Sequence, residues 1–292
     1  MYELVQVGPQ SYYLQSPAKI GLYTPDAQHA ILIDSGNDKD AGRKALKVLN
    51  AQGWTLTAIV NTHSNADHIG GNQYLQSQTG CAVFANGMEL AFTRHPVLEP
   101  AFLYDGFPNK DLQHKFLLAQ ESDALPFTDD RFPKGLQVIP LPGHFLDMVG
   151  FRTPDDTVFL ADCLSSEATL TKYGIPFIYD VAAFLTTLDT VEAMRARAFV
   201  PSHAEATDDI RALAAYNRAA VLAIGDALVS VCHTPTTFEK VLQAMFERYQ
   251  LQMNMEQYVL VGSTVRSFLM WLKDSGRLAC QFVNSQMLWQ AV

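Results

Sequence analysis

The sequence predicts an α/β protein with a mostly helical C-terminal module. Strand-like and helix-like segments alternate along the first two thirds of the chain, which is typical of α/β folds. After Thr207, apolar residues recur at helical spacing instead. With 48% hydrophobic and 17% charged residues, the composition is that of a folded protein. We expect a main domain at residues 1–206 and a smaller module at residues 207–292.

Short apolar runs mark the strands of the first third of the chain. The strand-like segments are residues 3–7, 19–23, 30–34, 56–61 and 81–85. Between them, residues 38–50 and 69–78 have the periodicity of helices. The run 30–34 stops at Ser35-Gly36-Asn37, a turn signal, so we expect a buried strand followed by a loop.

Residues 96–134 interrupt this alternation. They are rich in proline and aromatic residues, contain a short helical piece around 111–119, and resemble neither core layer. Long irregular segments often carry binding surface, so we expect a lid or wall over a site, and a contact in a homodimer is the alternative. As a wall, the segment would place Tyr104, Phe107 and Phe116 in a substrate pocket.

Strands and helices resume after this insertion. We expect strands at 136–141, 148–153, 157–160 and 199–201, with a helix at 181–197. Beyond Thr207, two helical segments, a third helix capped by Ser263 and two strand-like runs give the outline of a winged-helix module. The third helix carries only Arg266, Lys273 and Arg277 as cations, so we expect it to pack against protein rather than DNA.

Four of the eight histidines and two aspartates share one setting, because each lies at or just after the end of a predicted strand. They are His63, Asp67, His68, His144, Asp162 and His203. Side chains at matching ends of neighbouring strands converge on one crevice in α/β proteins. Imidazole and carboxylate groups are ligands that suit Zn²⁺, Fe²⁺ or Mn²⁺. The sequence therefore predicts a metal site.

The same residues carry a family resemblance. Residues 62–72, Thr-His-Ser-Asn-Ala-Asp-His-Ile-Gly-Gly-Asn, resemble the His-x-His-x-Asp-His signature of the metallo-β-lactamase superfamily. Pro142-Gly143-His144, Leu160-Ala161-Asp162 and Pro201-Ser202-His203 resemble its later motifs, in the same order. The resemblance covers about residues 1–206 and implies an αββα sandwich with a metal cleft at one edge of its two sheets.

The resemblance also implies two metal positions that share a bridging aspartate. The first would comprise His63, Asn65, His144 and Asp162, and the second Asp67, His68, Asp162 and His203. Asn65 stands where the family has a second histidine, and its neutral oxygen is a weaker ligand than imidazole. We therefore expect one or two divalent ions, zinc first and otherwise iron or manganese, with the second position filling first.

A metal of this kind indicates hydrolysis. It lowers the pKa of bound water toward about 7, and the resulting hydroxide attacks an electrophilic carbonyl or phosphoryl centre. Asp67 and Asp162 would orient the water or accept its proton, which makes them the expected catalytic residues. Asp34, at the end of a strand, would either hold a ligand imidazole or cap its loop.

We interpret the chain as a metal-dependent hydrolase of a small ester-, thioester- or lactone-like substrate. One alternative is a non-catalytic binding or scaffold protein, in which Asn65 marks the decay of the metal site. The other is a nucleic-acid-processing metallo-nuclease. The net charge of −9 argues against this second alternative, since neutralising phosphates requires clustered lysine and arginine.

Cysteine spacing and hydropathy bear on location. The four cysteines lie far apart with no Cys-x-x-Cys pair, which favours isolated thiols in a reducing compartment. No stretch approaches the roughly 18 unbroken apolar residues of a membrane span. The first residues lack the basic and apolar regions of a signal peptide. We therefore expect a cytoplasmic protein with a small-molecule substrate and no membrane partner.

Overall fold

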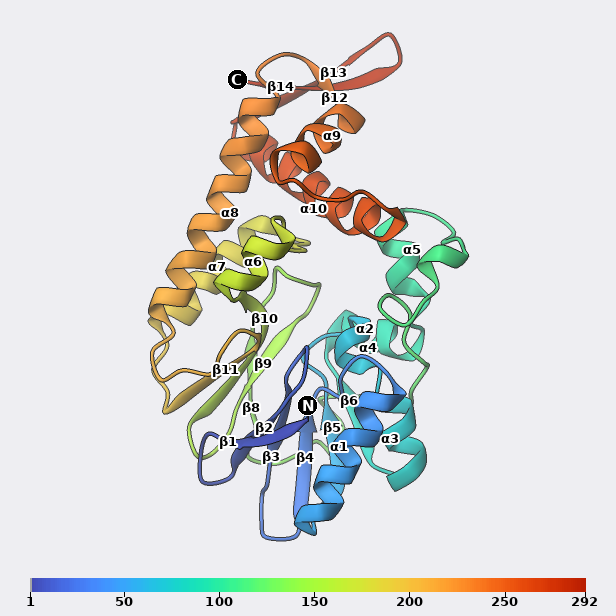
Figure 1. Cartoon of the computed structure of the whole chain (residues 1–292), viewed down its shortest axis with the longest axis vertical. Coiled ribbons are helices and arrows are strands. Elements are labelled where there is room, and N and C mark those ends of the chain that lie inside the picture. The colour runs from blue at the N-terminus through green and yellow to red at the C-terminus, as the bar shows by residue number, and fades with distance from the viewer. Residues whose placement is uncertain (1) are drawn as a thin grey trace.

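Two β-sheets packed face to face form the main body of the protein (Figure 1). The structure is a computed structural model that describes residues 2–292. The first sheet has seven strands, ordered β1 to β7. They are β1 (Glu3–Gln6), β2 (Ser11–Gln15), β3 (Ile20–Tyr23), β4 (His29–Ile33), β5 (Thr55–Val60), β6 (Ala82–Ala85) and β7 (Ala124–Pro126). Strands β1 to β4 pair antiparallel, whereas β4 to β7 pair parallel.

The second sheet has four strands in the order β11-β10-β9-β8. They are β8 (Gln137–Pro140), β9 (Val149–Arg152), β10 (Thr157–Ser165) and β11 (Ala198–His203). Strands β8, β9 and β10 pair antiparallel, and β10 pairs parallel with β11. The crossover from β10 to β11 contains α6 (Glu167–Tyr173) and α7 (Val181–Ala193).

Apolar side chains form separate layers between and outside the sheets. Between them, Phe84 of the first sheet and Phe151 of the second belong to one buried cluster. Outside the first sheet, α1 (Lys39–Gln52) and α3 (Asn72–Thr79) contribute Leu49 and Leu75 to another. Outside the second sheet, α7 packs through Leu188. This arrangement confirms the αββα sandwich.

The C-terminal region is mostly helical, as predicted. It comprises α8 (Arg211–Val231), β12 (Thr236–Thr237), α9 (Phe238–Arg248), α10 (Met255–Asp274), β13 (Leu278–Val283) and β14 (Gln286–Ala291). Strands β12, β14 and β13 form a small third sheet, in that order. Leu228 of α8 and Phe268 of α10 share one buried cluster with α7, so this region continues the outer layer of the second sheet. Its winged-helix likeness and a boundary at residue 206 stay predictions.

The two longest C-terminal helices are α8 and α10. α10 begins at Met255, eight residues before the predicted cap Ser263, because the Asn254 side chain accepts the Gln257 N–H and caps the helix. α8 is long and apolar enough to span a membrane by length and composition alone. However, its side chains Val221 and Leu228 are buried in the cluster shared with α7 and α10, as in the core helix of a folded domain.

The insertion joins both the first sheet and the C-terminal region. Its β7 pairs parallel with β6, which corrects the expectation that residues 96–134 match neither core layer. The helix expected around 111–119 is only a 3₁₀ turn, η1 (Lys110–Leu112). Leu112 and Leu117, which anchor this stretch, are five residues apart and so do not share a helix face. Both pack against Val259 of α10, and a homodimer contact stays a prediction.

Candidate metal centre

Six side chains meet at one edge of the two sheets, where strands β5, β8 and β11 end. Their possible ligand atoms fall into two groups, each with all its atoms within 4.8 Å of one another. The first ligand group is His63, His144 and Asp162, with Asn65 beside it, and the second ligand group is Asp67, His68, Asp162 and His203. The geometry thus brings together the six residues that the strand ends and motifs indicate.

The shared aspartate does not follow its strand as predicted. Asp162 lies inside β10, which runs on to Ser165 instead of ending at residue 160. The pairing of β10 with β11 shifts register on both sides of Ala161, whose φ is 51°. The irregularity therefore coincides with the residue that both groups share. His203 is likewise the last residue of β11 rather than part of a loop after residue 201.

Asp34 supports one histidine from each group. The Nδ1 atom of His68 donates to Asp34 Oδ2 at 2.8 Å. The Nδ1 atom of His63 lies 2.9 Å from the Thr62 hydroxyl, which donates to the same oxygen of Asp34 at 2.7 Å. Because acceptors occupy the Nδ1 side of both rings, Nδ1 carries a proton and Nε2 is left for a ligand role.

Asn65 is oriented by a residue of the insertion. Its Nδ2 donates to Glu99 Oε1 at 2.8 Å, and Glu99, on α5 (Leu98–Tyr104), also accepts the Ala66 N–H. The Asn65 Oδ1 then lies 3.1 Å from His144 Nε2. His144 donates its Nδ1–H to the Phe177 carbonyl at 3.0 Å, so two acceptor atoms face each other. A cation between them would stabilise this arrangement.

A second buried glutamate holds the same loop. Glu89, on α4 (Gly87–Arg94), accepts hydrogen bonds from the N–H and the hydroxyl of Ser64, at 2.9 and 2.5 Å. Its other oxygen accepts the Asp147 N–H at 2.9 Å. Burial raises the pKa of Glu89 to about 7 and raises that of Glu99 well above its usual value. Neither glutamate is predictable from its local sequence, since nothing there marks it as the partner of a loop 25 or 33 to 34 residues away.

A close approach explains the glycine before His144. Gly143 has a φ of 123°, a region that favours glycine. A Cβ atom there would lie 2.3 Å from the backbone nitrogen of Phe184 in α7. Only glycine therefore lets the loop after β8 pass this close to α7 while carrying His144.

Buried polar atoms at the centre lack partners. Within the described residues, His63 Nε2, His68 Nε2 and Asp162 Oδ1 are buried with no hydrogen bond. His68 Nε2 and Asp162 Oδ1 are 3.1 Å apart, but their geometry is not that of a hydrogen bond. Leaving such atoms unsatisfied costs about 1–3 kcal/mol each, so the site favours an occupant. Imidazole and carboxylate donors fit a divalent ion such as zinc.

Negative charge concentrates in the second ligand group. Burial alone would lower the pKa of His203, but Asp162 and Asp67 outweigh burial and raise it to about 10. The pKa of His68 rises well above its usual value for the same reason. In the first ligand group, burial and the nearby His68 instead lower the pKa of His63 well below its usual value.

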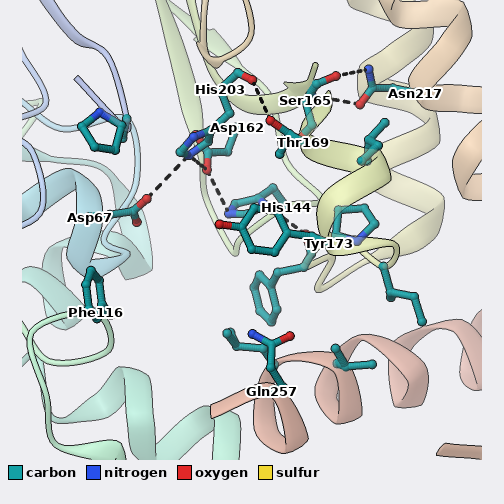
Figure 2. Close-up of a pocket in the computed structure, with 18 of the residues that line it drawn as sticks. Asp67, Phe116, His144, Asp162, Ser165, Thr169, Tyr173, His203, Asn217 and Gln257 are labelled. Atoms are coloured by element: carbon teal, nitrogen blue, oxygen red, sulfur yellow. Dashed lines mark hydrogen bonds and ion pairs between the residues drawn. The ribbon is translucent and has the colours of Figure 1, made fainter. Parts of the chain in front are cut away.

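A cavity of about 380 Å³ opens beside the ligand atoms (Figure 2). Four of the candidate ligands border it: Asp67, His144, Asp162 and His203. Phe116 of the insertion lies on the Asp67 side, Tyr173 of α6 lies on the opposite side, and Gln257 of α10 lies across from Asp162 (Figure 2). The insertion thus does form part of a wall over the site.

Two predicted pocket residues lie elsewhere. Of the described residues, Tyr104 and Phe107 are not among those bordering the cavity, and they are 44% and 86% exposed. Tyr104 is the last residue of α5, and the chain turns away at Asp105, whose φ is 61°. Helix α6, which also borders the cavity, is not among the predicted helices, although its cap Ser166 and its end at Gly174 are recognisable helix signals.

Sequence comparisons agree with this geometry. The model of the metallo-beta-lactamase superfamily matches residues 16–203. A hydroxyacylglutathione hydrolase from Psychromonas ingrahamii is 32% identical over 140 residues, which are 48% of this chain and 44% of the relative. One from Methylococcus capsulatus is 33% identical over 122 residues, 41% and 38% of the two chains. The chain thus spans less than half the length of these curated relatives.

Solved structures extend the likeness to the whole chain. A metallo-beta-lactamase family protein from Thermus thermophilus superposes with a TM-score of 0.75 at 20% identity, covering 98% of this chain and 100% of that one. A beta-lactamase domain protein from Burkholderia ambifaria has a TM-score of 0.70 at 16% identity, covering 99% and 94%. Since the family match spans well over half of the chain and includes all six ligand candidates, this chain belongs to the metallo-β-lactamase superfamily.

Proposed function

We propose that the protein is a metal-dependent hydrolase of a small ester-, thioester- or lactone-like substrate. The observation that carries the proposal is the pair of ligand groups around Asp162, with unpartnered nitrogen and oxygen atoms buried at their centre. The first ligand group would hold one divalent ion with Asn65, and the second would hold another. Zinc suits these donors best, and iron or manganese would also fit.

A bound divalent ion would activate a water molecule at neutral pH and would also polarise the carbonyl group of the substrate. Around it, the chain's own carboxylates would position the reactants. The Asp67 side chain is 36% exposed and borders the cavity, so it can orient the attacking water and accept its proton. Asp162 also borders the cavity but is mostly buried, and it would act mainly by holding the histidines.

Neighbouring side chains are poor nucleophiles. The Ser64 hydroxyl donates to Glu89, which leaves it directed away from attack. Cys163 is fully buried, and burial raises the pKa of its thiol, which keeps it protonated. Water is therefore the nucleophile that this site supports, and the expected reaction is hydrolysis.

Relatives and cavity size support the substrate class. The curated relatives are named hydroxyacylglutathione hydrolase, and an acylglutathione is a thioester. A cavity of about 380 Å³ lies within the range of small-molecule sites. We therefore propose a small molecule as the partner, in keeping with the cytoplasmic location expected from the cysteines.

The test combines metal analysis with a substrate panel. Protein purified without chelators should contain at least one divalent ion per chain. It should hydrolyse members of a panel of esters, thioesters and lactones, and should lose this activity to a chelator and regain it with metal. Asp162→Ala, which removes the residue shared by both groups, should lose both metal and activity, whereas the exposed Asp40→Ala should lose neither.

Other outcomes would reject the proposal. Metal content far below one ion per chain, unchanged in Asp162→Ala, would identify a binding or scaffold protein with a degenerate site. Cleavage of RNA or DNA without hydrolysis of the panel, through binding that weakens steeply with salt, would identify a nuclease.

A further inference from the structure

We propose that the substrate is a neutral ester or lactone with an apolar chain rather than an anionic thioester such as a glutathione conjugate, an inference that rests on the hydrolase function proposed above. The cavity beside the ligands has one end formed by the candidate ligands, and its other walls are mostly apolar. The walls, the charges and the hydrogen bonds of the cavity each point to this class of substrate.

The walls are formed by apolar side chains from separate elements. Leu170 of α6, Val221 of α8 and Val261 of α10 border the cavity, and each is less than 10% exposed. Other apolar residues of the lining are Ile175, Phe177, Phe184 and Leu260. α10 lies across the cavity from Asp162 and His203 (Figure 2). A chain extending from the reacting carbonyl toward Leu260 and Val261 of α10 would therefore meet hydrocarbon, whereas Glu256 and Gln257 make the first turn of this helix polar.

The charged residues at the cavity, apart from the histidines, are all acidic. They are Asp67, Asp162 and Glu256, and of the described residues no lysine or arginine borders it. The nearby Lys115 pairs with Asp38 at 2.8 Å, which offsets its charge. Two glutathione carboxylates would lose hydration here and gain no cationic side chain in return.

Two polar side chains of the wall, Asn217 and Thr169, already have hydrogen-bond partners within the protein. The Asn217 Oδ1 accepts the Ser165 N–H and its Nδ2 donates to the Ser165 carbonyl, both at 2.9 Å (Figure 2). The Thr169 hydroxyl lies 2.8 Å from the Ser166 hydroxyl and donates to the His203 carbonyl at 3.4 Å. These groups tie α8 and α6 to the strands, so they do not supply the hydrogen bonds that a polar peptide such as glutathione would need.

The first test measures chain-length dependence in the metal-loaded protein. For chromogenic esters of increasing acyl length, kcat/KM should rise about fourfold for each added methylene until the cavity is full, which corresponds to about 0.8 kcal/mol per buried methylene. Unreactive alkyl ketones of the same lengths should show the same trend in binding affinity, by calorimetry. This binding readout does not depend on turnover.

The second test separates charge from thioester chemistry. A neutral thioester and the glutathione thioester of the same acyl group differ in the charge of the thiol part but not in the bond broken. We expect kcat/KM for the neutral compound to exceed that for the glutathione conjugate at least tenfold.

Substitutions on α10 locate the effect in the cavity wall. Leu260→Lys places a cation at a half-buried lining position, and should flatten the chain-length dependence and narrow the preference for the neutral thioester. Met270→Lys makes a similar change at a position of the same helix that is 48% exposed, and should behave like the unchanged protein. Val261→Ala is a milder second variant that enlarges the cavity and should shift the preference to longer chains.

The outcomes separate this inference from the proposed function. A flat chain-length dependence, or a preference for the glutathione thioester, would overturn the apolar substrate and leave the hydrolase intact. If fully metal-loaded protein hydrolyses no ester, thioester or lactone at all, the proposed function itself fails, and the apolar substrate fails with it.

Discussion

The two ligand groups around Asp162 differ in charge and in support. The second ligand group contains two carboxylates, Asp67 and Asp162, and these raise the pKa values of its histidines. The first ligand group has only the shared carboxylate, and its fourth donor is the neutral amide of Asn65. Because a divalent cation gains more from full negative charges than from an amide dipole, we expect the two positions to differ in affinity.

The largest expected effect is the loss of metal affinity when a histidine ligand is removed, and this loss should differ between the two ligand groups. His68→Ala removes a ligand of the tighter position and should lower metal affinity and kcat/KM by at least about a hundredfold. His63→Ala should remove only the weaker ion and cost less affinity. Chelator competition with metal analysis measures both, and the exposed His29→Ala is the control. Equal losses in the two variants would contradict the asymmetry.

Replacing Asp34, which supports a histidine of each ligand group, should lower the metal affinity of both groups, and the second ligand group should still bind more tightly than the first. In Asp34→Asn, the acceptor for His68 and for the Thr62 hydroxyl loses its charge. We expect affinity at each position to fall roughly 10- to 100-fold, as is typical for residues that hold metal ligands. Asp38→Asn, on the cap of α1, should leave metal binding unchanged. If Asp34→Asn lowers metal affinity only at the second position, the hydrogen bonds from Asp34 through Thr62 to His63 do not contribute to metal binding.

The difference in metal affinity between the two ligand groups should become smaller when the amide of Asn65 is replaced. Asn65→His puts an imidazole beside His144, with Glu99 positioned to accept its second N–H. We expect affinity at the first position to rise on the order of tenfold, while the second position serves as the internal reference. Stepwise metal titration against a chelator resolves the two positions. Unchanged affinity at the weaker position would show that the Asn65 side chain does not contact the ion.

The smallest effect should come from the residue that orients the amide. Glu99→Gln disturbs the partner of Asn65 Nδ2, and we expect the weaker position to lose about fivefold in affinity, which corresponds to one hydrogen bond of about 1 kcal/mol. Glu89→Gln is the matched control, because Glu89 holds Ser64 of the same loop and does not contact Asn65. Equal effects of the two substitutions would indicate general loop support instead of orientation of Asn65.

Local patterns predicted the α/β architecture and the gathering of six polar strand-end residues, whereas the sandwich followed from the family resemblance. A strand and its end can be recognised from a few consecutive residues, as in the apolar run 30–34 that stops at Ser35. Parallel pairing brings such ends to one edge within each sheet, whereas the family motifs linked His63 of the first sheet to His203 of the second. Asp162 belongs to this set, even though the strand that carries it continues past it.

Features that depend on distant contacts could not be predicted in this way. Glu89 and Glu99 lie in helices with ordinary apolar neighbours, and only the folded chain shows that they hold the loop of His63. β7 has three residues and is defined by pairing with β6 rather than by its own pattern. The direction of the aromatic side chains in the insertion depends on the turn at Asp105, which composition does not reveal.

Helix α10 contributes to the cavity from a late part of the chain. The candidate ligands all lie between residues 63 and 203, whereas part of the opposite wall comes from residues 256–261, more than fifty positions later. On the proposed function, part of the residues that select the substrate would therefore lie on a later stretch of the chain than the residues that hold the metal. Substitutions at a few α10 positions would then change which compounds are accepted without altering the metal ligands.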